Sequence, residues 1–92
     1  MPRILYTYDV ISGKQDDPKR TRFNKELYGY RYKWDTKVGL KQNQKLGFLV
    51  MRNGRKVADS VILVSDDYEV EFDGFFDKYS DVIVVHKFRV ID

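Results

Sequence analysis

The chain has 92 residues, 42% of them hydrophobic, and a formal net charge of +3, which is typical of one folded domain and not of a disordered segment. It has no cysteine and a single histidine, His86, so disulfides, thiolate nucleophiles and Cys/His zinc sites are excluded. A bound metal would need oxygen ligands, as magnesium, manganese and calcium do. No apolar run reaches the roughly 18 residues of a membrane span, and the N-terminus lacks a secretory signal pattern. We therefore expect a cytoplasmic protein with no membrane partner.

The small net charge conceals an asymmetry along the chain. Residues 1–56 hold 14 Lys and Arg against 5 Asp and Glu, a balance of +9, whereas residues 57–92 hold 3 against 9, a balance of −6. The basic part could attract a polyanion such as nucleic acid by steering and counterion release. Alternatively, the two parts simply neutralise each other across the fold.

The N-terminal third predicts a strand followed by a basic helix. The β-branched and aromatic run 3–10 is typical of a buried central strand, and it would bring Asp9 to its C-terminal edge. Asp17 as N-cap and Pro18 at the first helical position predict a helix that ends near Gly29. Several cations spread over the surface of this helix, namely Lys19, Arg20, Arg22 and Lys25.

The next segment changes to the period of a strand. Aromatic side chains in 28–34 alternate with mostly basic ones, including Arg31 and Lys33, so the two kinds occupy opposite faces. The aromatic residues are Tyr28, Tyr30, Tyr32 and Trp34. If exposed, they would form a stacking and phosphate-contacting surface for nucleic acid; if covered, they would be core or a dimer contact. The polar stretch 36–45 is predicted to be a loop.

A hairpin is predicted after this loop. Its strands would be 46–51 and 56–65, joined by a turn at the Asn-Gly dipeptide 53–54, which suits the positive φ of a type I′ turn. Arg52 and Arg55 would flank the projecting tip. Two cations at such a tip suit contacts with a nucleic-acid backbone, although charged tips also serve solubility.

The C-terminal third predicts strand, helix, strand. The unbroken apolar run 61–64 is typical of a second central strand. Asp66 as N-cap with Glu69 three positions on predicts a capping box, and 81–92 closes the chain as an edge strand. Between them lies a helix whose apolar stripe forms part of the core, with the members Tyr68, Phe72, Phe75, Phe76 and Tyr79.

This order of elements predicts an α+β fold in a single domain, 1–92. Two strand–helix–strand crossovers give the ferredoxin-like plait, a split βαβ arrangement with an antiparallel sheet and two helices on one face. In that plait the runs 4–10 and 61–64 take the two central positions, and 28–34 is an extra strand, or else the true second strand with 46–51 inserted. Dimerisation through the open face or an edge is the expected solution for a domain this small.

Four features of the chain match a known family: Tyr8-Asp9-Val10 after the first strand, the basic helix with Lys19, Arg20 and Arg22, Tyr28-Gly29-Tyr30-Arg31, and Asp59-Ser60-Val61. Together they resemble the small CRISPR-associated endoribonuclease that bridges the spacer-integration complex. The resemblance implies a ferredoxin-like homodimer in which Asp9 is the catalytic, metal-linked carboxylate, paired with its symmetry mate. It also implies that Arg20, Arg22 and Arg31 contact nucleic acid. The chain departs from the family in having Ile62 where the family has Phe, and in a longer middle segment.

Three functions stay open at this point. The first is a nucleic-acid-binding homodimer, on DNA or RNA, that uses Arg20, Arg22, Arg31, Lys33, Arg52 and Arg55. The second is a metal-dependent endonuclease, a phosphodiesterase, in which paired Asp9 carboxylates hold magnesium or manganese, with Asp59, Asp66 and Asp67 as the other acids to consider. The third is a protein-interaction or structural module of a mobile element, without nuclease activity.

Overall fold

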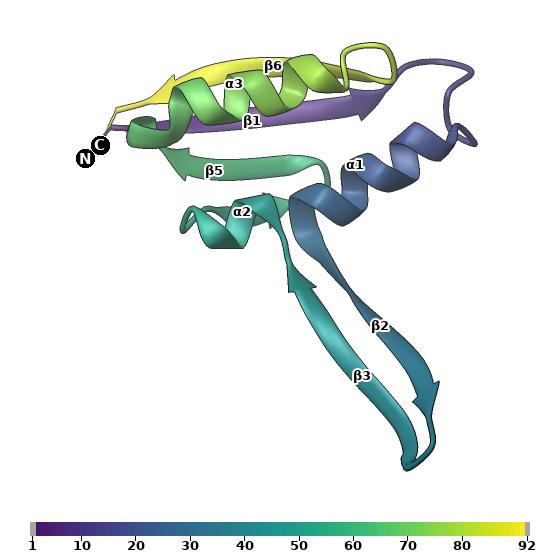
Figure 1. Cartoon of the computed structure of the whole chain (residues 1–92). Coiled ribbons are helices and arrows are strands. Elements are labelled where there is room, and N and C mark those ends of the chain that lie inside the picture. The colour runs from purple at the N-terminus through teal and green to yellow at the C-terminus, as the bar shows by residue number, and fades with distance from the viewer. Residues whose placement is uncertain (1, 92) are drawn as a thin grey trace.

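The computed structural model describes residues 2–91 as an α+β fold (Figure 1). Its main sheet has four antiparallel strands in the order β4-β5-β1-β6, and β2 and β3 form a separate two-stranded sheet. The strands are β1 (Arg3–Val10), β2 (Gly29–Thr36), β3 (Gly39–Leu46), β4 (Arg55–Ala58), β5 (Val61–Ser65) and β6 (Ile83–Val90). The helices are α1 (Pro18–Tyr28), α2 (Phe48–Met51) and α3 (Glu69–Lys78), and a 3-10 turn over Asp66–Tyr68 precedes the last. The fold is the predicted ferredoxin-like plait with an additional hairpin.

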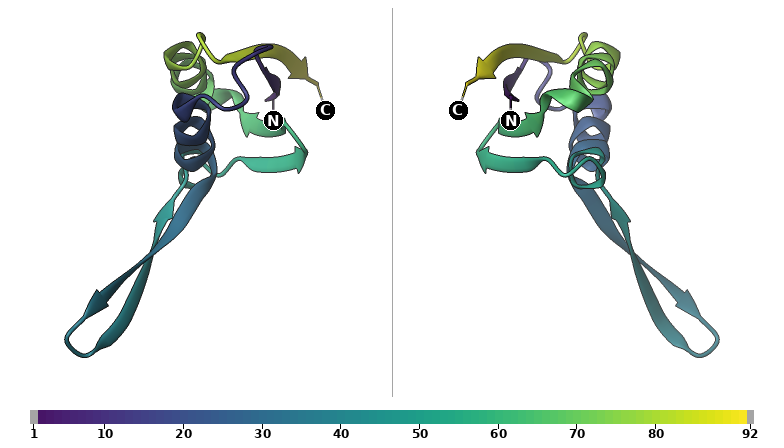
Figure 2. Two further views of the ribbon diagram at one scale, coloured as in Figure 1. Left: turned by 90° about the vertical axis from the view of Figure 1, so that its right-hand side faces the viewer. Right: turned by 90° about the vertical axis from the view of Figure 1, so that its left-hand side faces the viewer.

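The core lies between the sheet and the two long helices, which cover the same face of the sheet (Figure 2). Every second residue of the two central strands is buried beneath the helices, namely Ile4, Tyr6, Ile62 and Val64. The helices and the segment after α3 cover them with Phe23, Leu27, Phe72, Phe75, Phe76, Tyr79 and Val82. Because burying one large apolar side chain contributes roughly 1.5–3 kcal/mol, this mostly aromatic cluster is what holds the helices on the sheet.

The central positions of β1 and β5 are as predicted. β1 pairs with β5 on one side and with β6 on the other, so that Leu5 lies between Leu63 and Phe88. The two most apolar strands thus occupy the two inner places, where their alternate residues can be buried.

The ends of the helices confirm one predicted cap and correct another. Asp17 accepts a hydrogen bond from the amide of Lys19 at 2.8 Å, and α1 ends at Gly29, as predicted. The capping box at Asp66 is wrong. The Ser65 side chain is the cap, and it serves the 3-10 turn, so α3 begins only at Glu69 with no side-chain cap. The extra turn lies between β5 and α3, where a direct helix start was expected.

The predicted hairpin at 46–65 is wrong in both strands and in its turn, because most of 46–51 is helical and 56–65 is divided by a turn into β4 and β5. Residues 48–51 form the single helical turn α2, because Leu49 is buried in the core and Phe48 packs against it, while Val50 and Met51 lie at the surface. Asn53 has the expected positive φ of 57°, but it ends that helical turn instead of joining two strands. The actual hairpin is β4–β5, and its turn lies at Asp59-Ser60.

The predicted loop 36–45 is also wrong, because most of it is strand β3. It pairs along its whole length with β2, from Gly29 opposite Leu46 to Thr36 opposite Gly39. We call this hairpin, residues 29–46, the arm. The arm projects away from the plait (Figure 1) and is inserted between α1 and β4, the second strand of the plait. Of the two alternatives for 28–34, an extra strand or the true second strand, the extra strand is therefore correct.

The face of the main sheet opposite the helices carries apolar side chains that no element of residues 2–91 covers (Figure 2). We call it the open face. Its apolar members alternate with the buried ones and comprise Leu5, Val61, Leu63, Val84, Phe88 and Val90. None of the helices in residues 2–91 has the length and apolar character that crossing a bilayer requires.

Candidate nucleic-acid interface

Three aromatic side chains form a ladder along one face of the arm. Tyr30, Tyr32 and Trp34 are 39%, 42% and 43% exposed. The ring centroids of Tyr30 and Tyr32 are 6.0 Å apart, and those of Tyr32 and Trp34 are 5.6 Å apart with planes inclined by only 24°. The rings are not part of the core, and each contacts its neighbour in the ladder. These contacts limit the movement of the rings, while part of each ring stays accessible to a ligand.

The same face of the arm carries positive charge from the neighbouring strand. In an antiparallel pair, residues directly opposite each other share a face, and the register places Lys45 opposite Tyr30 and Lys41 opposite Trp34. Asn43 lies opposite Tyr32. We call this set of six residues the aromatic face. Proteins that bind single-stranded nucleic acid combine aromatic rings, which stack on the bases, with cations, which contact the phosphates.

The cations that the sequence placed on β2 lie on the other side of the arm. Arg31 is opposite Gln44 and Lys33 is opposite Gln42, so neither shares a face with the aromatic rings. The alternation predicted this separation. Strand β3 was not predicted from the sequence, because the polar stretch 36–45 is typical of a loop, and the residues that lie opposite the aromatic rings were therefore not predicted either. Gly39, which suits a turn between two strands, was the one available signal.

The aromatic face continues into a groove where the arm joins the plait. This basal groove has a volume of about 480 Å³ and is lined by the following residues: Arg22, Lys25, Glu26, Tyr30, Lys45, Leu46, Phe48, Met51 and Arg52. Lys25 lies over the Tyr30 ring, with its Nζ 5.3 Å from the centroid. Two of the predicted nucleic-acid contacts, Arg22 and Arg52, therefore line the same groove as Lys25 and Lys45.

The charges of the groove are not all free to bind. Arg52 donates to the Glu71 carboxylate at 3.3 Å and lies over the Phe48 ring at 3.5 Å, so it is held in place by α2 and α3. Glu26 is the one acid of the groove. Burial acts to raise its pKa, but the Lys78 ammonium at 2.7 Å and the nearby Arg22 hold that pKa below its usual range. Glu26 is thus ionised and balanced by Lys78, and the groove keeps an excess of positive charge.

The remaining predicted cations lie elsewhere. Arg20 faces a second cavity on the other side of α1. Arg55 pairs in register with Leu63 and lies beside Arg3, on the open face. Arg52 and Arg55 do not share a hairpin tip as expected, because the segment between them follows a helical turn and not a strand.

Asp9 lies at the C-terminal end of β1, exposed on the side of the open face, where its Oδ1 accepts a hydrogen bond from the Val10 amide at 2.9 Å. Asp66 lies at the opposite end of β1, where its amide donates to the Pro2 carbonyl, so it and Asp67 cannot share a site with Asp9. Residues 2–91 contain no group of three or more His, Asp or Glu that could hold a metal. The magnesium or manganese site at Asp9 therefore stays a prediction, and it depends on a second copy of Asp9.

The plait, the arm and the aromatic face can be compared with what is known of other proteins. Comparison with protein-family models, with curated proteins and with solved structures finds no match.

Proposed function

We propose that this protein binds single-stranded nucleic acid along the aromatic face of the arm. The observation that carries the proposal is the ladder Tyr30–Tyr32–Trp34, partly exposed and flanked by Lys41 and Lys45 on the same face. Stacking on aromatic rings needs the flat faces of bases, which a duplex hides between neighbouring base pairs and a single strand presents. A single strand is therefore the form of nucleic acid that this surface suits.

The position of the ladder argues against a purely structural role. Core aromatics in this chain, such as Phe23 and Phe72, are fully buried, whereas the three ladder rings are 39% to 43% exposed on the projecting arm. Exposed aromatic surface without a partner favours association. The lysines on the same face make a polyanion the best match, and the basal groove with Arg22 and Lys25 extends the path of the strand toward the plait.

Removal of the lysines of the aromatic face tests this proposal. If about four cations each neutralise one phosphate, the logarithm of the affinity should fall with the logarithm of the salt concentration with a slope of about −3. The double variant Lys41→Gln/Lys45→Gln should make that slope shallower by about 1.4. The measurement is fluorescence anisotropy of labelled oligothymidine and oligouridine between roughly 50 and 200 mM salt.

The matched control for this experiment is Arg31→Gln/Lys33→Gln, which removes the same charge from the opposite face of the same arm. It should change the slope by less than half as much. Equal effects of the two double variants would mean diffuse attraction and no defined face. Absence of binding at low salt would point to a protein partner for the ladder.

We also propose that the protein is a homodimer that covers the open face. Phe88 and Val84 are 54% and 44% exposed there, and Phe88 lies opposite the half-buried Leu5. A two-fold axis would bury this apolar surface against an identical copy, and Arg3 and Asp9, at opposite ends of β1, give the face charges of both signs. The resemblance to the CRISPR-associated family, which predicts that Asp9 meets its symmetry mate, supports the same proposal.

The substitution Phe88→Arg should convert the dimer to a monomer, because it places a charge within the apolar surface, beside Leu5, without touching the core. Sedimentation velocity of the wild type and the variant measures this directly. Val70→Arg is the control, since Val70 is 84% exposed on α3, on the other side of the molecule. A wild-type protein that sediments as a monomer at all concentrations would contradict the dimer.

A further inference from the structure

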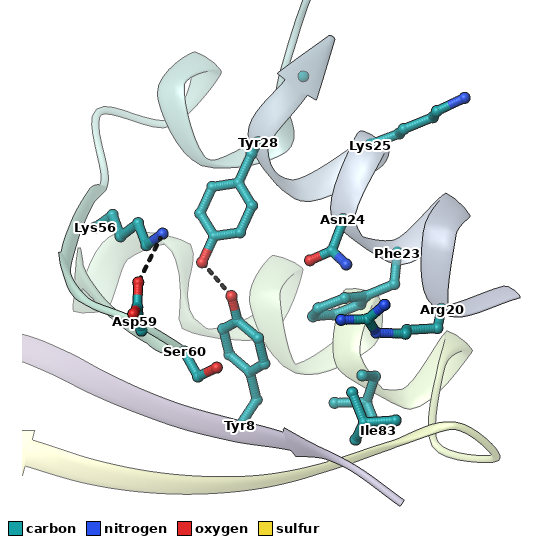
Figure 3. Close-up of a pocket in the computed structure, with 12 residues that line it drawn as sticks. Tyr8, Arg20, Phe23, Asn24, Lys25, Tyr28, Lys56, Asp59, Ser60 and Ile83 are labelled. Atoms are coloured by element: carbon teal, nitrogen blue, oxygen red, sulfur yellow. Dashed lines mark hydrogen bonds and ion pairs between the residues drawn. The ribbon is translucent and has the colours of Figure 1, made fainter. Parts of the chain in front are cut away.

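A second cavity lies between α1, the end of β1 and the β4–β5 turn (Figure 3). We call it the Arg20 cavity. Its volume is about 440 Å³, which is within the range of small-molecule sites. Apolar side chains form part of its wall, and polar groups converge on it from two elements, with the members Arg20, Asn24, Lys25, Lys56, Asp59 and Ser60.

Within residues 2–91, Arg20 lines this cavity and forms no ion pair with a carboxylate. Its Nε is buried and has no hydrogen-bond partner, and its Nη1 reaches only the Gln15 carbonyl, at 3.4 Å. A buried donor left unsatisfied costs roughly 1–3 kcal/mol, and more when it is charged. In Figure 3 the guanidinium extends from α1 toward the space beside Asn24 and Ile83. An anionic acceptor bound there would satisfy it.

The other donors of the cavity are also available. Within residues 2–91 the side chains of Asn24 and Ser60 make no hydrogen bond. Lys56 lies across the cavity from Arg20 and pairs at 3.4 Å with Asp59, a fully exposed carboxylate that can turn into solvent. Asn24, Ser60 and Lys56 can each donate a hydrogen bond to an oxygen of a ligand, whereas the carboxylate of Asp59 opposes an anion.

Two tyrosines complete the wall. The hydroxyls of Tyr8 and Tyr28 contact each other at the back of the cavity, and the Lys56 ammonium lies 5.2 Å from the centroid of the Tyr28 ring. Burial and the contact with Tyr28 raise the pKa of Tyr8 far above its usual range. Most polar groups of the cavity are hydrogen-bond donors, and several carry positive charge. Such a lining suits an anionic ligand whose oxygens only accept hydrogen bonds.

We infer that the Arg20 cavity binds the phosphate of a nucleotide, with Arg20 as its main charged partner. A phosphate offers several strong acceptor oxygens, and the planar guanidinium is suited to bind two of them. Lys25 lines both this cavity and the basal groove, so the phosphate can be the terminal one of a strand on the arm or that of a free nucleotide. The first source rests on the proposed function; the second does not.

The test compares oligothymidines of one length that carry a hydroxyl at both ends, a 5′-phosphate or a 3′-phosphate, together with free thymidine monophosphate and inorganic phosphate. For the wild type, one of the two phosphorylated ends should raise the affinity by about tenfold, the value of one charge-assisted contact of roughly 1.4 kcal/mol. Arg20→Gln should remove that increment and leave the affinity for the hydroxyl-ended strand within about twofold. The control Lys14→Gln removes a charge at a half-exposed site outside both cavities and should keep the increment.

The outcomes separate the two proposals. Binding of the hydroxyl-ended strand, with no gain from either end phosphate and no binding of thymidine monophosphate or phosphate, would overturn the cavity inference and leave the arm as the binding surface. Binding of thymidine monophosphate or phosphate, lost in Arg20→Gln, with no binding of any strand would support the cavity and overturn the arm. Shifts of the Asn24 and Ser60 amide signals in nuclear magnetic resonance spectra, on titration with thymidine monophosphate, would locate the ligand; shifts confined to other regions would contradict the inference.

Discussion

The double substitution Tyr32→Ala/Trp34→Ala is expected to lower the affinity for a single-stranded oligonucleotide by about 30-fold or more. Each aromatic ring that stacks on a base contributes about 1–3 kcal/mol, and these two rings lie 5.6 Å apart in the most exposed part of the ladder. Losing both therefore costs about 2 kcal/mol at the least. The loss is not electrostatic, so the slope of affinity against salt should stay as in the wild type.

Anisotropy with labelled oligothymidine measures this loss, and two controls make it specific. Tyr32→Phe/Trp34→Phe keeps a ring at both positions and should retain most of the affinity. Urea unfolding of the alanine variant should give a free energy close to that of the wild type, because surface substitutions away from the core usually change it by no more than about 0.5 kcal/mol. An alanine variant that is folded and binds as tightly as the wild type would show that the ladder is not the binding surface.

The topology of the plait could be predicted because its elements carry their own signals. The run in β5 is continuously apolar, the α1 cap at Asp17 is local, and the stripe on α3 follows a helical period. These features depend on neighbours in the sequence. Where the structure depends on neighbours in space, prediction failed: Phe48–Met51 has the composition of a strand, but burial of Leu49 against the core makes it a helical turn.

For the same reason, only the β2 side of the candidate interface could be predicted. The alternation of β2 correctly separated the aromatic rings from Arg31 and Lys33. The lysines that share the aromatic face come from β3, a polar strand whose eight residues are all exposed and therefore carry no apolar alternation. Only the cross-strand register relates Lys41 to Trp34 and Lys45 to Tyr30. Likewise Arg20 and Arg22 are two residues apart on α1 and face different cavities.

The point where the arm leaves the plait should be the most sensitive to small substitutions. Gly29 ends α1 and begins β2 with φ of 81° and ψ of 176°, a conformation that is almost restricted to glycine. A Cβ there would also lie 2.3 Å from the Lys45 carbonyl oxygen. Opposite it, a Cβ on Gly47 would lie 2.4 Å from the Leu27 carbonyl oxygen. Both contacts are with backbone, which cannot move aside without moving the arm.

Gly29→Ala is therefore expected to lower the free energy of unfolding by about 3 kcal/mol or more, from about 1–3 kcal/mol of backbone strain together with the steric overlap. Gly47→Ala should cost about 1–3 kcal/mol, as overpacking without strain usually does. Gly74→Ala is the control: it lies within α3 with nothing within 4 Å of the added Cβ, so it should stabilise the protein by about 1 kcal/mol. Urea unfolding measures all three variants. Equal stabilities for Gly29→Ala and Gly74→Ala would mean that the two strands of the arm are not held against the end of α1. In that case the aromatic face would have no fixed relation to the basal groove, and a strand could not follow one path from Trp34 to Arg22.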